Sequence, residues 1–561
     1  MKNRTVILGI DGATFDIINP LIERGELKNL KSLIDTGTKG FLRSTIPSYT
    51  PVAISSFLTG MNPGKHGIFD FTITNHNNYE TFKNLANSST IKAPTIWELF
   101  GKTDKKIISF LFPLSYPPQP VNGIMVSKVK PEIMETKPFT YPESLKNELF
   151  AHLGNVDYSR MPFSADVRRK YRSSSKDFFS RSLNNLYYKF EKEKEAIRYL
   201  MSKHEWDLLM LYFNNTDLTQ HWFWKFMDKR HPLYDSGRSE YSEEIFNIYK
   251  AIDAFIGELL SKIGNDVNLL IFSDHGFGPL YYKFQLNNWL MDKGLLVIKP
   301  GKRKRLTIAR RNLKEISRRF GLGELVKVLP GRIKGISFPV PRMTNIPLRE
   351  IVDWQRTRAY GTLFGININL KGRDPMGIVE KSECDELVNY IKSELKTLSY
   401  TDRNCIIENV FQKEELYNGE SLDYATDILF IFKNEFPCQV SIDISEDGVF
   451  KNTGDEEMLS GTHFSSINGI FVASGKDIER GKVIHGASII DILPTVLYLM
   501  GQPVPSNIDG KVLKDAITSD FLSQNPMEFR EGEHVTRKEF VFTNEEREAI
   551  QKELKGLGYL E

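Results

Sequence analysis

The chain has 561 residues, of which 40% are hydrophobic and 26% are charged, and its net charge is +3. This composition is typical of a soluble globular protein, and the small net charge gives no reason to expect nucleic acid as a partner. The three cysteines, Cys384, Cys405 and Cys438, form no CxxC pair, which argues against a disulfide framework. The first apolar run is too short for a signal peptide, so we expect a cytoplasmic protein.

Short apolar runs recur along the chain, and each ends in polar or glycine residues. They cover residues 6–10, 107–111, 208–213, 269–272, 428–432 and 470–473. Runs of this length fit strands that are buried on both faces of a parallel sheet. Helical stretches such as 181–203 and 243–263 lie between them, so the sequence predicts a doubly wound α/β fold, in which ligands bind beyond the carboxyl ends of the strands.

Two segments interrupt this alternation. Residues 130–199 begin with a polar, proline-containing stretch and are expected to form a cap. Residues 301–345 are basic: from Lys302 to Arg342 there are thirteen Lys or Arg and two Glu, a net charge of +11. This part is either a solvated surface insertion or an arm that contacts an anionic ligand or membrane surface. The expected core is then 1–129, 200–300 and 346–525, followed by a helical tail at 526–561.

Acidic and imidazole side chains follow two of the apolar runs. Asp11 comes directly after the first run, although an Asp-Gly pair is, by itself, more often a turn. Asp274 and His275 follow the fourth run, and Gly276 and Gly278 allow the chain to turn so that both side chains can converge. This pair is the most specific motif in the sequence, because few structural roles place two ligand-type residues at the end of a strand.

Thr50 precedes Pro51 at the start of a stretch that is expected to be helical. The ordinary interpretation is that Thr50 caps the helix. The same geometry would stabilise a phosphoryl group on its hydroxyl, because a helix N-terminus favours anions. Thr50 is therefore a candidate nucleophile, and Ser48, Ser55 and Ser56 are competing hydroxyls.

Two further segments carry potential metal ligands. Asp217 and His221 are four residues apart, which places both on one face of a helix within reach of one ion, although surface pairs also occur at this spacing. His463 alone would more often be a structural histidine. Carboxylates and imidazoles together suit a divalent cation such as zinc. The candidate ligands are Asp11, Asp217, His221, Asp274, His275 and His463.

The order of these segments resembles the alkaline phosphatase superfamily, most closely its type I phosphodiesterase/nucleotide pyrophosphatase branch. Within that branch the chain is similar to bacterial and archaeal proteins described as phosphohydrolases or phosphomutases. The resemblance spans nearly the whole chain and implies an alkaline-phosphatase-like doubly wound sheet with cap insertions. The segments that carry it are Ile10-Asp11-Gly12, Thr50-Pro51, Asn62-Pro63-Gly64-Lys65-His66-Gly67, Asp217 with His221, Ser273-Asp274-His275-Gly276, and His463.

The resemblance implies two divalent metal ions, zinc or alternatively manganese. The ligands of one ion would be Asp217, His221 and His463, and those of the other Asp11, Asp274, His275 and Thr50. Thr50 would attack phosphorus, and water or a second alcohol would then release the phosphothreonine. The residue three positions after Thr50 is Ala53, so a donor to the phosphate oxygens is expected from elsewhere, with Lys65, Asn214 and Asn215 as candidates.

The sequence thus predicts a metal-dependent phosphohydrolase or phosphodiesterase that acts on a phosphorylated small molecule, a glycan or a lipid-linked substrate. In one alternative, a phosphotransferase or phosphomutase, an alcohol replaces water, and the outcome depends on whether the cap excludes water. The other alternative is a protein that only binds a phosphoglycan. Every expected ligand is present, which favours catalysis over binding alone.

Overall fold

The computed structural model describes most of the chain. The described residues are 4–75, 79–129, 131–154, 176–264, 266–300, 348–401, 405–444, 448–453, 459–464 and 466–556. The basic segment from Lys302 to Arg342 and residues 155–175 of the expected cap lie outside them. The boundaries expected for the core, the cap and the tail therefore stay predictions.

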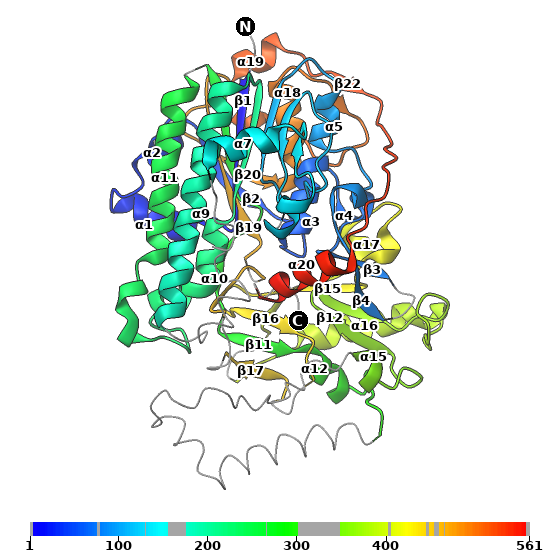
Figure 1. Ribbon diagram of the computed structural model, residues 1–561. Helices are drawn as coiled ribbons and strands as arrows, with labels where there is room; N and C mark the ends of the chain where they lie inside the picture. The colour runs from blue at the N-terminus through cyan, green and yellow to red at the C-terminus, as the bar shows by residue number, and fades with distance from the viewer. Residues whose placement is uncertain are drawn as a thin grey trace.

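A nine-stranded sheet forms the centre of the molecule, with the strand order β20-β2-β19-β9-β1-β8-β5-β6-β7 (Figure 1). Strands β19 and β7 run antiparallel to their neighbours, and the other pairs are parallel. The strands are β1 (Arg4–Ile10), β2 (Thr38–Arg43), β5 (Ile107–Phe110), β6 (Gly123–Val126), β7 (Thr140–Tyr141), β8 (Leu208–Phe213), β9 (Val267–Phe272), β19 (Asn468–Ser474) and β20 (Lys482–Ser488).

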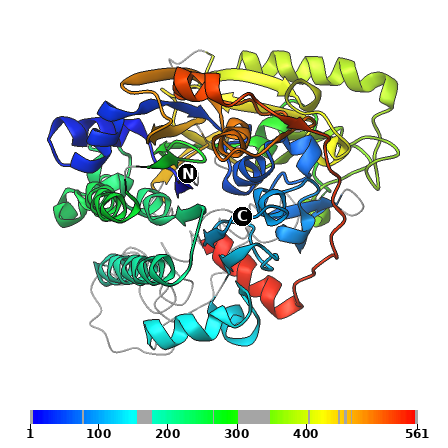
Figure 2. The same cartoon turned by 90° about the horizontal axis from the view of Figure 1, so that it is seen from above.

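Helices cover both faces of this sheet, as the view from above shows (Figure 2). Val6 and Leu8 pack into one hydrophobic core and Ile7 into another, because successive side chains of a strand point to opposite faces. The first core includes α1 (Phe15–Glu23), α2 (Lys28–Thr36), α9 (Lys176–Lys203), α10 (Asn215–Met227) and α11 (Glu244–Ile263). The second includes α3 (Thr50–Thr59), α5 (Ile96–Gly101) and α18 (Ile492–Leu499). The predicted doubly wound α/β fold is confirmed.

The chain between β9 and β19 forms a second group of smaller sheets with a hydrophobic core of its own, in the lower part of Figure 1. The run expected at 428–432 belongs here rather than to the central sheet. The strands are β10 (Gly278–Pro279), β11 (Tyr282–Gln285), β12 (Ala359–Thr362), β13 (Gly365–Ile368), β14 (Ile407–Gln412), β15 (Ile428–Phe432), β16 (Cys438–Ser441), β17 (Phe450–Asn452) and β18 (Gly461–Thr462).

The last part of the chain returns along the core. Strand β22 (Phe529–Arg530) pairs with β21 (Val504–Pro505), and an extended segment then leads to α20 (Asn544–Gly556), red in Figure 1. Phe540 and Phe542 of this segment pack against Tyr116. The C-terminal segment thus contacts residues that precede the expected cap.

No helix in the described part of the chain is both long and apolar enough to cross a membrane.

Candidate active site at the carboxyl edge of the central sheet

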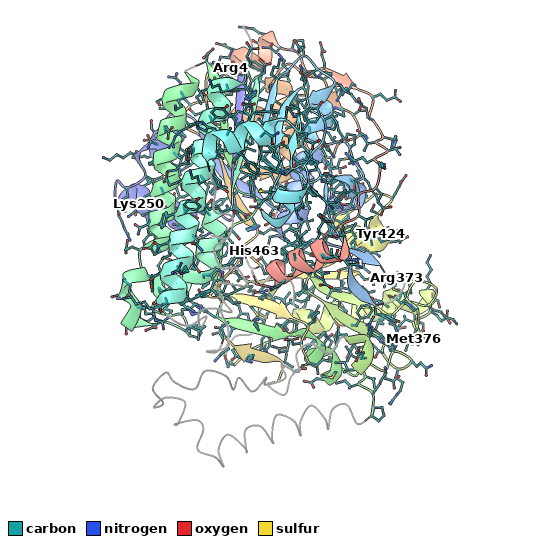
Figure 3. The ribbon with its side chains drawn as sticks, viewed as in Figure 1. Arg4, Lys250, Arg373, Met376, Tyr424 and His463 are labelled. Carbon is teal, nitrogen blue, oxygen red and sulfur yellow. The ribbon has the colours of Figure 1, made fainter. Side chains whose placement is uncertain are left out.

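The carboxyl ends of three neighbouring strands bring the predicted ligands together. In the paired register, Gly9 of β1 lies beside Tyr212 of β8 and Phe272 of β9, so these strands end at the same level. Asp11 follows β1, α10 begins after β8, and Asp274 follows β9. His463 follows β18 and lies where the central sheet meets the lower sheets (Figure 3). Residues far apart in sequence therefore meet at the edge that the sequence predicted.

Each of the three candidate histidines is oriented by a backbone carbonyl. The acceptors of the Nδ1 atoms are Gly461 O for His221 (2.8 Å), Gly276 O for His275 (2.9 Å) and Ser48 O for His463 (2.7 Å). A carbonyl oxygen only accepts, so Nδ1 carries the proton and Nε2 of the neutral ring is a lone-pair donor. This is the arrangement of histidines that bind metal ions in proteins.

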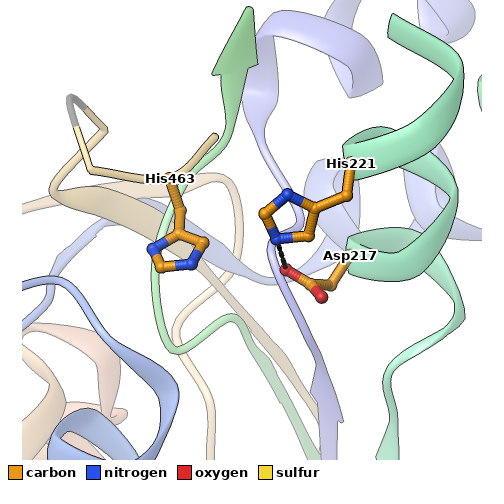
Figure 4. A group of neighbouring side chains, drawn as sticks. All are labelled: Asp217, His221 and His463. Carbon is orange, nitrogen blue, oxygen red and sulfur yellow. Dashed lines mark ion pairs between the residues drawn. The ribbon is translucent and has the colours of Figure 1, made fainter. Parts of the chain in front are cut away.

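The ligand atoms form two overlapping groups, within each of which they lie no more than 4.8 Å apart. One group consists of Asp217, His221 and His463, and Nε2 of His221 lies 3.4 Å from Oδ1 of Asp217 (Figure 4). The other consists of Asp11, Asp217 and His275. Oδ2 of Asp274 adds to this second group at 3.4 Å from Nε2 of His275. The rings of His275 and His463 stack with centroids 4.2 Å apart, so both groups belong to one continuous site.

The buried carboxyl groups of Asp11 and Asp274 need a positive counter-charge. Burial, followed by repulsion from the other carboxylates, raises the pKa of Asp11 well above its usual value, and burial raises that of Asp274 to about 6. Oδ1 of Asp11 and Oδ2 of Asp274 have no hydrogen-bond partner among the described residues. Buried carboxylates need counter-charges, and the oxygen and nitrogen donors present here suit divalent cations. The residues therefore fit a metal centre.

Asp217 and His221 behave as an ion pair within the site. Burial alone would raise the pKa of Asp217, but His221 and the other histidines outweigh this effect, and the pKa is lowered. Burial lowers the pKa of His221, but Asp217 outweighs this effect and raises it. Burial and the neighbouring rings lower the pKa of His463 well below its usual range. These shifts favour a charged pair of Asp217 and His221 beside a neutral His463.

Thr50 points its hydroxyl into this cluster. It is the first residue of α3 and is 4% exposed, and Tyr49, not Thr50, occupies the N-cap position. Oγ1 of Thr50 lies 3.2 Å from Nε2 of His275. Since that nitrogen carries no proton, the hydroxyl donates to it. Among the competing hydroxyls, Ser48 donates to the carbonyl of His463 (3.0 Å) and Ser56 contacts His66 (2.9 Å), so both are engaged elsewhere.

The candidate substrate-binding residues have different surroundings. Nζ of Lys65 lies 2.5 Å from Oδ1 of Asp509 and donates to the carbonyl of Asn507 (3.0 Å). Oδ1 of Asn214 accepts from Nζ of Lys189 (3.0 Å). Asn215 is fully buried, and its side-chain amide has no hydrogen-bond partner in the described part of the chain. A role of these three residues in substrate binding stays a prediction.

Lys128 is a potential functional residue that the sequence analysis did not single out. It follows β6 at the same carboxyl edge, and its Nζ lies 5.3 Å from the centroid of Tyr212. Burial lowers the pKa of its ammonium below the usual value, although Asp11 and Asp217 act in the opposite direction. A single lysine after a strand forms no recognisable motif. Only the general rule that ligands of such sheets bind beyond the carboxyl ends of the strands could have indicated Lys128 from the sequence.

Three comparisons relate the chain to known proteins. The family model for type I phosphodiesterase / nucleotide pyrophosphatase matches residues 5–437. A search of curated proteins finds no match. Similar solved structures include murine ectonucleotide pyrophosphatase / phosphodiesterase 5, inactive and in complex with AMP (12% identity), and its human counterpart (13%). In both cases the match covers 92% of this chain and 100% of the other, with a TM-score of 0.49. Because the family match covers most of the chain, the protein belongs to the type I phosphodiesterase/nucleotide pyrophosphatase family of the alkaline phosphatase superfamily and is a phosphoric diester hydrolase.

Proposed function

We propose that the protein hydrolyses phosphoesters of small molecules in two displacements, with Thr50 as the nucleophile in a site for two divalent ions. The observation that carries this proposal is the position of the Thr50 hydroxyl, 3.2 Å from Nε2 of His275 inside a cluster of buried carboxylates and imidazoles. A threonine that only capped a helix would not need three carboxylates and three histidines around it.

The proposed ligands of one ion are Asp217, His221 and His463, and those of the other are Asp11, Asp274, His275 and Thr50. Bound divalent ions would lower the pKa of the threonine hydroxyl and offset the charge of the phosphoryl oxygens. The mixture of imidazole and carboxylate ligands favours zinc, with manganese as the alternative.

In the first displacement, Oγ1 of Thr50 forms a bond to phosphorus as the bond to the leaving alcohol breaks. The phosphoryl group then sits at the N-terminus of α3, where the positive end of the helix dipole favours its charge. In the second displacement, water attacks phosphorus and the Thr50 oxygen leaves with a proton. Each displacement inverts phosphorus, so the complete reaction retains its configuration.

The first test compares bis-p-nitrophenyl phosphate, a diester, with p-nitrophenyl phosphate, a monoester, in the presence of zinc or manganese. We expect turnover of the diester and a loss of about three orders of magnitude or more in Thr50→Val and Asp274→Asn. Ser55→Ala, which removes a buried hydroxyl five residues further along the same helix, is the matched control and should remain active. A Thr50→Val protein that binds metal and keeps a tenth of the activity would contradict the proposed nucleophile.

The same assay separates the alternatives. Transfer of the phosphoryl group to an added alcohol in preference to water would indicate a phosphotransferase or phosphomutase. Two ions bound per chain without turnover of either ester, or of phosphorylated glycans, would indicate a phosphoglycan-binding protein. These outcomes differ in the fate of the phosphoryl group, so product analysis distinguishes them.

We also propose that the protein acts in the cytoplasm and that its substrate is a phosphorylated small molecule, a glycan or a lipid-linked compound. Cys384, Cys405 and Cys438 form no disulfide, which supports a reducing compartment. Contact with an anionic membrane surface through Lys302 to Arg342 is part of this proposal. Sedimentation with phosphatidylserine vesicles tests it: we expect salt-sensitive binding that is lost when this segment is deleted, and no binding would contradict it.

A further inference from the structure

The turn that carries Asp11 is held by hydrogen bonds along its backbone. The N–H of Asp11 donates to the carbonyl of Phe213 at the end of β8 (2.9 Å), and the carbonyl of Asp11 accepts from Oγ1 of Thr216. The N–H of Gly12 donates to Oδ1 of Asp274, which follows β9 (3.4 Å). The position of the Asp11 carboxylate is therefore set by groups that follow the two neighbouring strands.

A side-chain amide from α10 and a phenol from α11 complete this arrangement. Nε2 of Gln220 donates to the carbonyl of Gly12 (2.8 Å), and the hydroxyl of Tyr249 donates to Oε1 of Gln220 (3.1 Å). The same hydroxyl accepts from the N–H of Thr14 (3.2 Å). These three hydrogen bonds form a chain that leaves the turn at Thr14 and returns to it at Gly12.

Burial makes this chain of hydrogen bonds specific. Gln220 is fully buried, and Tyr249 is 4% exposed. Because the phenol oxygen of Tyr249 accepts from Thr14, its proton is directed at Oε1 of Gln220, and the amide then presents Nε2 to Gly12. A buried polar group that loses its partner keeps its desolvation cost, so the loss of one hydroxyl should displace the turn.

Helix α10 joins this chain to the candidate metal ligands. Two pairs of its residues are four positions apart, Thr216 with Gln220 and Asp217 with His221. The first pair bonds to the turn after β1, and the second pair supplies ligand atoms. A Cβ atom on Gly12 would lie 3.3 Å from Nε2 of Gln220 and 3.5 Å from Cβ of Asp217. The turn therefore packs directly on the ligand-bearing part of α10.

We propose that Gln220 and Tyr249 are positioning residues for Asp11. They hold the turn after β1 against α10 and thereby raise the affinity for the ion assigned to Asp11, Asp274 and His275. This inference rests on the proposed function, because it takes from it the assignment of two ions to the site. Residues that orient a metal ligand without touching the ion typically change the metal affinity by about ten- to a hundredfold.

Calorimetric titration with zinc of the full-length protein, freed of metal by a chelator, tests this inference without turnover. Asp11→Asn identifies the binding step of the ion that Asp11 holds. We expect Tyr249→Phe to weaken that same step by about tenfold or more. The other step should change less, because its ligands Asp217 and His221 stand on α10 itself. Equal weakening of both steps, or of neither, would overturn the proposal.

Tyr498→Phe is the matched control for the loss of a buried phenol. Tyr498 is 5% exposed, packs in the second hydrophobic core rather than in that of Tyr249, and donates to the carbonyl of Asn525 (2.6 Å). Its substitution should lower the thermal stability of the metal-free protein as Tyr249→Phe does, but should leave both zinc affinities unchanged. An equal loss of zinc affinity in the two variants would show an effect of stability alone and contradict the proposal.

A double variant tests whether the two side chains act as one unit. Gln220→Met keeps the length of the side chain but removes both of its hydrogen bonds. Tyr249→Phe added to Gln220→Met should then weaken zinc by less than about twofold further, whereas multiplicative effects would contradict a connected chain. The double variant leaves neither side chain with an unpaired polar group, so it should fold where Tyr249→Phe alone does not.

Zinc affinity and turnover can fail separately, which distinguishes this inference from the proposed function. Selective weakening in Tyr249→Phe, in a protein whose wild type hydrolyses no ester, would support the positioning role and contradict the hydrolase. Hydrolysis that depends on Thr50, with zinc affinities that do not depend on Tyr249, would contradict the positioning role alone. In the active protein, a raised zinc concentration should restore most of the kcat of Tyr249→Phe, because the variant loses metal affinity and no reacting group.

Discussion

The three histidines of the site show how single residues are prepared for metal binding. Each Nδ1 donates to a carbonyl on a different segment: His221 to the segment before His463, His275 to the next residue, and His463 to the segment before Thr50. The backbone thus fixes both the tautomer and the ring orientation. A shift of the backbone near Gly461 or Ser48 would turn the ring of His221 or His463, which both belong to the group that contains Asp217.

His66 illustrates a histidine with a structural role. It is fully buried, its Nδ1 accepts the N–H of Ile68 (3.2 Å), and its Nε2 therefore donates to Oγ of Ser56 (2.9 Å). Burial lowers the pKa of His66 to about 3. The folded-state pKa lies below the unfolded value of about 6.5, so the unfolded chain binds the extra proton first. The stability that depends on neutral His66 is therefore complete above pH 6.5 and is lost as the pH falls towards 3.

We accordingly predict that His66→Asn reduces the pH dependence of the free energy of unfolding between pH 6.5 and 4. The contribution of His66 to the slope is at most about 1.4 kcal/mol per pH unit. Urea denaturation at several pH values measures this slope. His485, which is exposed on β20, provides the control, and His485→Asn should keep the wild-type slope. Equal slopes for wild type and His66→Asn would contradict the prediction.

Among the elements, β18 and α10 approach each other so closely that only a glycine fits between them. A Cβ atom on Gly461 would lie 2.5 Å from the carbonyl oxygen of Gln220. The N–H of Ser460 also donates to the carbonyl of His221 (2.7 Å). Glycine at 461 is thus needed because backbone packs against backbone. This contact holds the carbonyl that orients His221 and places His463 two residues further on.

We predict that Gly461→Ala destabilises the protein by about 1–3 kcal/mol, because the added methyl group overpacks this contact. It should also lower the affinity for the ion held by Asp217, His221 and His463. Thermal unfolding and metal analysis after dialysis measure the two effects. Gly101→Ala, whose Cβ would meet nothing closer than 3.7 Å, should leave both unchanged. Full metal retention in Gly461→Ala would contradict the proposed link between packing and ligation.

At the scale of the whole molecule, the C-terminal segment holds distant parts of the core together. The guanidinium of Arg537 pairs with Glu98 of α5 and donates to the carbonyls of Ile91 and Ala93. Glu98 itself caps α5 through the N–H of Thr95 (2.9 Å). Arg537, which lies near the end of the chain, therefore donates hydrogen bonds to several acceptors in the first fifth of the chain.

We predict that Arg537→Ala lowers the free energy of unfolding by about 2 kcal/mol, because it leaves a carboxylate and two carbonyls without their donor. Lys102→Ala, which breaks the more exposed pair with Glu533, should cost less than about 1 kcal/mol. Chemical denaturation of both variants at the same pH measures the difference. Equal effects of the two substitutions would contradict the role given to Arg537.

The same feature of the sequence predicted both the central sheet and the position of the candidate metal ligands at one edge of it. Buried parallel strands read as short apolar runs, and the residues that follow them must lie at one edge. The run at 428–432 looked the same but formed β15 of a smaller sheet, because an apolar run does not specify which sheet it joins. The histidine tautomers and the contact between Lys128 and Tyr212 depend on segments far apart in sequence, so no local pattern could predict them.

The central claim is that Thr50 carries the phosphoryl group between two displacements, and the stereochemistry at phosphorus tests it most directly. The substrate is a p-nitrophenyl phosphorothioate diester of one configuration, hydrolysed in water enriched in oxygen-18, with the configuration of the product determined by NMR. Two displacements predict retention of configuration. Inversion would show that water attacks the substrate directly, and would contradict a phosphothreonine at Thr50.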